Sequence, residues 1–233
     1  MNPHADTLTT APDGRSVLRM ERRVGHPPEK VRAALTRSGY LKPLLPAEVR
    51  VDPEPGGSLL TLTHTFDDRF AAPSLAAGWH LRLSALGEHL DGVAEPARVL
   101  DTGELHEAYL EQFDLGGGEV TADGTVRFER QLVRPADAVW AALTEGDEVL
   151  EGSEAPEGIV ADGVPAGDVT AVRVPETVTY DVAGGGEVSI RLGPGTEYGA
   201  RLVLTHRGAG DPAAARAAWH ARLERLAGRL LEG

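Results

Sequence analysis

The sequence predicts an α+β protein in which an antiparallel sheet and its closing helix occur twice, with the first copy abbreviated. Two observations lead to this fold class. A stretch of eighteen residues at 19–36 returns at 127–144, 108 positions on, and nine of the eighteen pairs are identical. A second phrase, LTLTH at 60–64, returns as LVLTH at 202–206. A period of this length indicates a duplicated domain rather than a solenoid of short units.

Each copy is expected to open with a strand and then a helix. Residues 17–21 and 126–129 alternate apolar with charged side chains, which is typical of a half-buried antiparallel strand. The helices are expected to begin near Pro27 and Pro135, because proline suits the first helical turn, where N–H groups have no intrahelical partner.

The middle of the two copies differs in length. The second copy has four apolar stretches separated by turn residues, which predict strands at 169–174, 177–180, 187–192 and 200–206. The first copy offers only 48–51 and 58–66. The spacing between equivalent residues grows from 108 to 142 across this region, so the first copy lacks 34 residues, room for about three strands.

Both copies are expected to close on a helix with a narrow apolar stripe. The stripe residues step by 4, 3 and 4 along the chain; they are Trp79, Leu83, Leu86 and Leu90, and Trp219, Leu223, Leu226 and Leu230. The two tryptophans are therefore interpreted as core anchors in preference to ligand-stacking residues.

The organisation that follows has four parts: a flexible N-terminus (1–14), an abbreviated repeat (15–92), an acidic helical linker (93–123) and a fuller repeat (124–233). The linker carries eight acidic residues and a single Arg or Lys, Arg98, and its apolar phase predicts a helix over 104–113.

Composition excludes several classes of function. The absence of cysteine excludes disulfides and thiolate chemistry. A net charge of −13 argues against nucleic acid or an anionic membrane as partner, because phosphate binding needs clustered basic residues. No HExxH motif, phosphate-binding glycine loop or Gly-x-Ser-x-Gly occurs, so no metal and no cofactor is expected. Without a signal peptide or a long apolar run, a soluble cytoplasmic protein is the expectation.

The order of these motifs resembles the START-like (SRPBCC) superfamily. It is most similar to bacterial homologues of the activator of the ninety-kilodalton heat-shock ATPase. The residues that carry the resemblance are Pro27, Val31, Ala34–Thr36, Leu60–His64 and Gly78–His80, with Pro135, Val139–Thr144, Leu202–His206 and Trp219–His220 in the second copy. The resemblance implies tandem helix-grip repeats, in which a curved sheet wraps a C-terminal helix around an apolar cavity.

A ligand site is expected only in the second copy, which alone has enough strands to curve round its helix. Its predicted walls come from alternate strand residues and the closing helix: Val174, Val178, Tyr180, Ile190, Leu204, His206, Trp219 and Leu223. Four histidines are repeat partners, His64 with His206 and His80 with His220. A structural role is favoured for all four, although His206 could also contact a ligand or move a proton.

Three hypotheses of function follow. The leading one is non-catalytic, with no catalytic residue assigned: the groove binds an apolar small molecule or an exposed segment of a client protein, in a chaperone-cofactor-like role. The alternative is an enzyme of the cyclase or hydrolase type with His206 as base. The third is a degenerate scaffold that only forms a homodimer. An open cavity with a convergent polar group would favour the enzyme, and a dry apolar cavity would favour the binding protein. The absence of a cavity would favour the scaffold.

Overall fold

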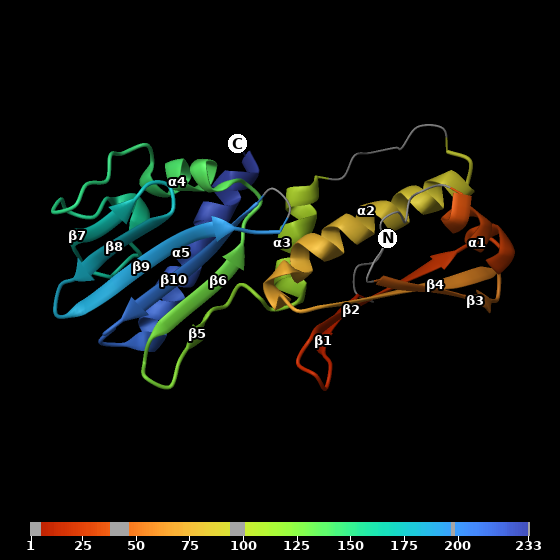
Figure 1. Cartoon of the computed structure of the whole chain (residues 1–233), viewed down its shortest axis with the longest axis horizontal. Coiled ribbons are helices and arrows are strands. Elements are labelled where there is room, and N and C mark those ends of the chain that lie inside the picture. Colours follow the sequence, from red (N-terminus) through yellow and green to blue (C-terminus); the bar gives the residue numbers. More distant parts are fainter. Residues whose placement is uncertain (1–5, 38–46, 94–100, 197–198, 233) are drawn as a thin grey trace. The chain divides into compact units, whose positions relative to one another are not determined.

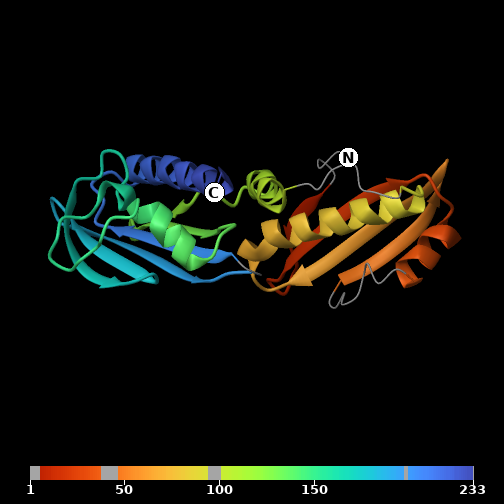
Figure 2. The same ribbon diagram turned by 90° about the horizontal axis from the view of Figure 1, so that it is seen from above.

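The chain folds into two compact units, residues 1–113 and 114–233, each with its own antiparallel sheet and long helix (Figure 1). The structure is a computed structural model that describes residues 6–37, 47–93, 101–196 and 199–232. The predicted α+β class is confirmed, and in each unit the last strand leads into a long helix that lies across one face of the sheet (Figure 2).

The N-terminal unit has a four-stranded sheet of order β1-β2-β4-β3, with every neighbour antiparallel. Its elements are β1 (Thr7–Thr10), β2 (Ser16–Val24), α1 (Pro28–Arg37), β3 (Ala47–Glu54), β4 (Gly57–Phe66), η2 (Arg69–Ala71), α2 (Ala72–Leu90) and α3 (Thr102–Gln112). The predicted strands and helices lie inside these bounds or within one or two residues of them.

The described part of the expected flexible N-terminus is ordered, which corrects the prediction for residues 6–14. Strand β1 pairs with β2 in the register Thr7 to Arg19, and the connecting turn is closed by Ala11 and Arg15. Gly14 adopts a left-handed φ of 88° in that turn, a conformation that glycine reaches without steric cost. The strand was missed because the four residues of β1 are mostly threonine and carry no clear apolar alternation.

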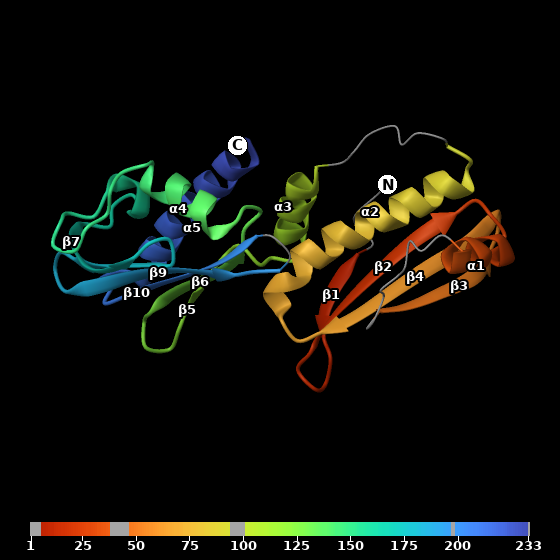
Figure 3. The ribbon, with the colours of Figure 1, turned by 45° about the horizontal axis from the view of Figure 1, so that its top comes forward.

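Helix α3 lies within the segment expected as an acidic linker, and it packs on α2 in the N-terminal unit (Figure 3). Asp101 caps it by accepting the backbone N–H of Gly103 at 2.6 Å. Tyr109, Leu110 and Phe113 are buried on the side that faces the unit's core. The described residues of this unit have no counterpart to two strands at one edge of the other sheet.

The C-terminal unit has a six-stranded antiparallel sheet of order β5-β6-β10-β9-β8-β7. Its elements are β5 (Glu119–Val120), β6 (Val126–Gln131), α4 (Ala136–Thr144), η3 (Glu157–Ile159), β7 (Ala166–Arg173), β8 (Thr177–Val182), β9 (Gly186–Pro194), β10 (Ala200–Arg207) and α5 (Pro212–Glu232). The described sheets differ by two strands, β7 and β8. About three extra strands had been expected in this unit. The other residues that the first copy lacks form the connection from α4 to β7.

Alternation along the strands places one face of each sheet against its helix. In β10, Leu202, Leu204 and His206 are buried, whereas the residues between them are partly exposed. In α5, Trp219, Leu223, Leu226 and Leu230 are all at most 4% exposed, as the stripe predicted. No helix in the described ranges is long and apolar enough to cross a bilayer.

Candidate functional site

The predicted walls of the cavity form a closely packed core in the middle of the C-terminal unit. Six of the eight wall residues are at most 2% exposed and belong to one cluster; they are Val178, Tyr180, Ile190, Leu204, Trp219 and Leu223. The hydroxyl of Tyr180 donates to the backbone oxygen of Ile159 at 3.0 Å, which ties β8 to the α4–β7 connection. These side chains contact one another across the place where an open groove had been expected.

Val174 is not a wall residue, and its assignment is corrected. Strand β7 ends at Arg173, and Val174 lies in the turn that follows, with 61% of its surface exposed. The prediction extended the strand by one residue, because valine favours strands and the first residue typical of a turn is the next one, Pro175.

A pocket of about 470 Å³ lies at one end of this core, and His206 is the predicted site residue that lines it. Its walls come from the α4–β7 connection, the β8–β9 turn, the β10–α5 connection and the first turns of α5. The lining residues are Asp162, Gly163, Val164, Pro165, Val182, Ala183, Gly184, Gly185, His206, Gly208, Ala209, Gly210, Asp211, Ala214, Ala215 and Ala218. The pocket exceeds the roughly 300 Å³ at which ordinary ligand sites begin.

Small residues keep this pocket open. Helix α5 turns Ala214, Ala215 and Ala218 toward it, whereas Trp219, one helical turn after Ala215, fills space in the core. Gly184 and Gly185 form the β8–β9 turn with φ values of 101° and 97° and contribute backbone alone. A Cβ atom on either glycine would meet nothing within 4 Å.

His206 stands at the end of β10, between the packed core and the pocket. The indole N–H of Trp219 donates to its Nδ1 over 3.3 Å. Because Nδ1 accepts, the neutral ring carries its proton on Nε2 and can offer only a donor there. Burial lowers the pKa of His206, which keeps the ring neutral near pH 7.

The Nε2 atom of His206 is buried and has no hydrogen-bond partner among the described residues. The residue as a whole is only 3% exposed. A buried donor left without an acceptor costs about 1–3 kcal/mol, so an acceptor that reached it from the pocket would be favoured. A general base needs a free lone pair, and the one on this ring is engaged by Trp219. The geometry therefore favours a hydrogen-bond donor over a base.

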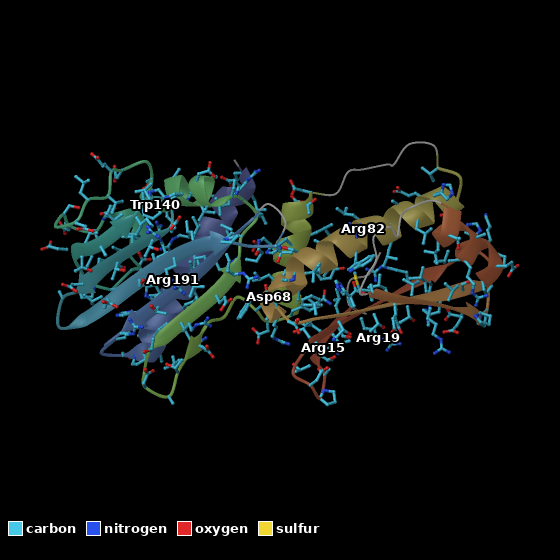
Figure 4. The ribbon with its side chains drawn as sticks, in the orientation of Figure 1. Arg15, Arg19, Asp68, Arg82, Trp140 and Arg191 are labelled. Atoms are coloured by element: carbon cyan, nitrogen blue, oxygen red, sulfur yellow. The ribbon has the colours of Figure 1, made fainter. Side chains whose placement is uncertain are left out.

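The same pair recurs in the N-terminal unit. The indole N–H of Trp79 donates to Nδ1 of His64 over 3.1 Å, and the two rings meet edge to face at 88°. Burial lowers the pKa of His64 as well. Arg82, labelled on α2 in Figure 4, places its guanidinium 5.2 Å from the centre of the Trp79 ring. Because this Trp–His pair is present in both units, it indicates a structural role. At His206 the adjoining pocket suggests a second role, in ligand binding.

The other two repeat-partner histidines have different surroundings. His80 is buried in α2, and its Nδ1 lies 2.8 Å from the hydroxyl of Tyr109 on α3. Because that hydroxyl donates to Asp6, His80 donates to the hydroxyl oxygen. His220 is exposed on α5, with its Nδ1 3.2 Å from the backbone oxygen of Gly116. Each histidine fixes a neighbouring segment to its helix, and neither lines a pocket described above.

Sequence reasoning missed a second pair of repeat partners, the buried arginines Arg22 and Arg130. Arg22 is 6% exposed and binds both carboxylate oxygens of Asp6, at 2.6 and 2.8 Å. Arg130 is 1% exposed and binds Glu224 on α5. The signal was available, because Arg22 shares strand parity with the core residues Leu18 and Met20.

Comparison with known proteins gives no family and no close relative. No family model matches the chain, and no curated protein matches it. Among solved structures, CalU16 from Micromonospora echinospora is 20% identical, and the match covers 49% of this chain and 82% of that one with a TM-score of 0.38. An AHSA1-like protein from Aeromonas hydrophila is 17% identical over 46% of this chain and 92% of its own, with a TM-score of 0.35.

A conserved protein of unknown function from Enterococcus faecalis is 15% identical. That match covers 48% of this chain and 91% of the other, with a TM-score of 0.40. Each of these three matches is to about half of the present chain. At this level of similarity none of them assigns a ligand or an activity to it.

Proposed function

We propose that the C-terminal unit binds a small molecule in the 470 Å³ pocket at the start of α5, with His206 as the hydrogen-bond donor that orients it. The observation that carries this proposal is the buried Nε2–H of His206, which has no partner among the described residues although the ring lines a pocket. The ligand supplies the missing acceptor, for example a carbonyl or ether oxygen.

The pocket walls favour a ligand with an apolar body. Around His206 stand small apolar side chains from three segments, among them Val164, Val182 and Ala215. Burial of apolar surface contributes about 25 cal/mol per Å² and supplies most of the affinity, while the single donor fixes orientation. The sequence motifs that resemble START-like proteins support a ligand-binding scaffold. Because these motifs occur twice, the proposal includes a tandem arrangement of two such repeats.

The geometry of the two units also suggests which of them binds the ligand. The N-terminal sheet is shorter, and α3 occupies space beside α2, so we assign ligand binding to the C-terminal unit and a structural role to the N-terminal one. Binding of a client protein, as in a chaperone cofactor, would need an exposed apolar surface. The large apolar residues that are exposed in the described ranges are Val93, Val120, Leu150 and Val174, which come from separate segments.

The test uses propiophenone, a small uncharged aryl ketone, and backbone NMR of the full chain. Addition of the ketone should shift the amide signals of Gly184, Gly185 and Gly208. Ala218→Leu fills the pocket from α5 and should weaken the binding at least about tenfold, because it removes buried contact area. Ala217→Leu, at an exposed position on the same helix that does not line the pocket, is the matched control and should bind as the parent does.

Two results would overturn the proposal. One is the absence of any saturable shift at these glycines. The other is undiminished binding by a folded Ala218→Leu protein. In either case the reading of the C-terminal unit as a scaffold without a ligand would take its place.

A further inference from the structure

The charges around the pocket have one sign, and this limits the ligands it can accept. Two charged side chains, Asp162 and Asp211, are among its lining residues, and neither lysine nor arginine is. We infer, on the basis of the proposed function, that the pocket selects a cation in preference to an anion of the same shape. The cation is a protonated amine that also carries a hydrogen-bond-acceptor oxygen.

Asp211 is one of the two acidic residues that line the pocket. It precedes α5 and accepts the backbone N–H groups of Ala213 and Ala214 through Oδ1, at 3.1 Å each. This cap uses the N–H groups that could otherwise attract an anion to the helix N-terminus. Its Oδ2 has no hydrogen bond within the described ranges, so it can accept one from a ligand ammonium.

Asp162 stands on the opposite wall, in the connection from α4 to β7. Its Oδ2 pairs with Arg225 at 3.1 Å, and 80% of its side chain is exposed. Arg225 lines the neighbouring hollow of about 390 Å³, on the far side of residues 162–164, together with Arg222 and Glu145. Asp162 lines both recesses, whereas Arg225, the cationic member of its pair, lines only the neighbouring one.

His206 supplies the second point of recognition. Trp219 holds its tautomer, so the ring that lines the pocket carries a neutral N–H at Nε2 and no positive charge. A neutral donor binds an uncharged oxygen, while the two carboxylates act on whatever charge the ligand carries. An amino ketone or amino ether satisfies both, with its oxygen at His206 and its ammonium group near Asp211 or Asp162.

Four probes of matched shape separate these contributions in the full chain at pH 7 and low salt. Protonated 3-amino-1-phenylpropan-1-one has both groups, propiophenone has the ketone only, and 3-phenylpropylamine has the ammonium only. The fourth probe, 3-benzoylpropionate, carries an anion. We expect the amino ketone to bind roughly five- to tenfold tighter than propiophenone, and the anion to bind more weakly than both. The preference should shrink as salt is added, because exposed charges are screened.

Asp211→Asn tests the charge without removing the helix cap, since asparagine caps a helix as well as aspartate does. It should lower the affinity for the amino ketone toward that for propiophenone and leave propiophenone binding unchanged. Asp137→Asn, at an exposed position in the first turn of α4, is the matched control and should change neither affinity.

The outcomes distinguish the inference from the function on which it rests. If propiophenone binds but the amino ketone binds no tighter, or if the anion binds tightest, the charge inference is wrong and the binding site stands. The same conclusion follows if Asp211→Asn leaves the amino ketone affinity intact. If none of the four probes binds, the proposed function falls together with the inference.

Discussion

The indole N–H of Trp219 donates to Nδ1 of His206, and this bond ties the closing helix to the last strand of the C-terminal sheet. The distance is 3.3 Å, and both residues are at most 3% exposed. The bond also decides what the pocket offers a ligand, because the ring atom that remains is a donor. Trp79 and His64 repeat the contact in the N-terminal unit.

Trp219→Phe should destabilise the protein mainly through the acceptor it leaves behind. Phenylalanine keeps an aromatic ring in the core but leaves Nδ1 of His206 buried without a donor, at a cost of about 1–3 kcal/mol. Trp140→Phe is the control, since Trp140 on α4 (Figure 4) is also buried and its indole N–H makes no hydrogen bond to a described residue. Urea denaturation would measure both, and an equal loss for the two variants would contradict the role of the hydrogen bond.

Stability should fall as the pH drops below about 6.5. Burial lowers the pKa of His64, His80 and His206 in the folded protein from 6.5, the value of a free side chain. The unfolded chain therefore takes up protons first, and folding stability that is complete above pH 6.5 is lost as the pH falls toward the folded-state pKa values. Urea midpoints at pH 7.5, 6.5 and 5.5 would show the slope.

The variant His64→Asn/His206→Asn serves as the control for that slope. It removes two of the three rings whose pKa is lowered and should flatten the pH dependence between 7.5 and 5.5. A slope as steep as that of the parent protein would mean that other groups are responsible.

Asp6→Asn should be strongly destabilising, because it leaves the buried guanidinium of Arg22 without a counter-charge. Loss of one partner from a buried ion pair costs about 3–5 kcal/mol. Asp13→Asn breaks the pair of Asp13 with Arg15, whose two side chains are half exposed, and should have little effect on stability because water screens the pair. Thermal and urea unfolding of the two variants would test the difference, and a mild effect of Asp6→Asn would count against it.

Two glycine substitutions should have opposite effects on the stability of the folded protein. Gly228→Ala in α5 places a Cβ atom where nothing lies within 4 Å, and should stabilise the helix by about 0.5–1 kcal/mol. Gly118→Ala is expected to destabilise, because its φ is +61° and the new Cβ atom would lie 2.5 Å from the ring of Phe128. Melting temperatures that moved in the same direction for both would contradict this assignment of the backbone.

The sheets and closing helices could be predicted because their signals are periodic. Alternating residues located β2, β6 and β10, and the stripe from Trp219 to Leu230 located α5 on its sheet. Duplication strengthened each prediction, since two copies had to agree. The short strand β1 is mostly threonine and lacked such a signal.

The candidate site could be predicted only at His206. Alternation shows which side chains face the helix, but it does not show whether they touch. Val178, Ile190 and Leu204 face inward as expected and close the space between themselves. The pocket forms one turn away, where alanines and glycines leave room, and residues of that kind give no distinctive pattern in a sequence. Its position depends on packing, which requires the three-dimensional structure.

The buried carboxylate of Asp6 has a consequence for the order in which the N-terminal unit is completed during synthesis. It joins Arg22 to Tyr109 by a 2.6 Å hydrogen bond, and the backbone oxygen of Asp6 accepts from Gln112 at 2.6 Å. The first described residue of the unit is thus held by its last helix. The sheet and α2 are complete by residue 90, yet on the ribosome this unit can reach its final packing only after α3 has also emerged.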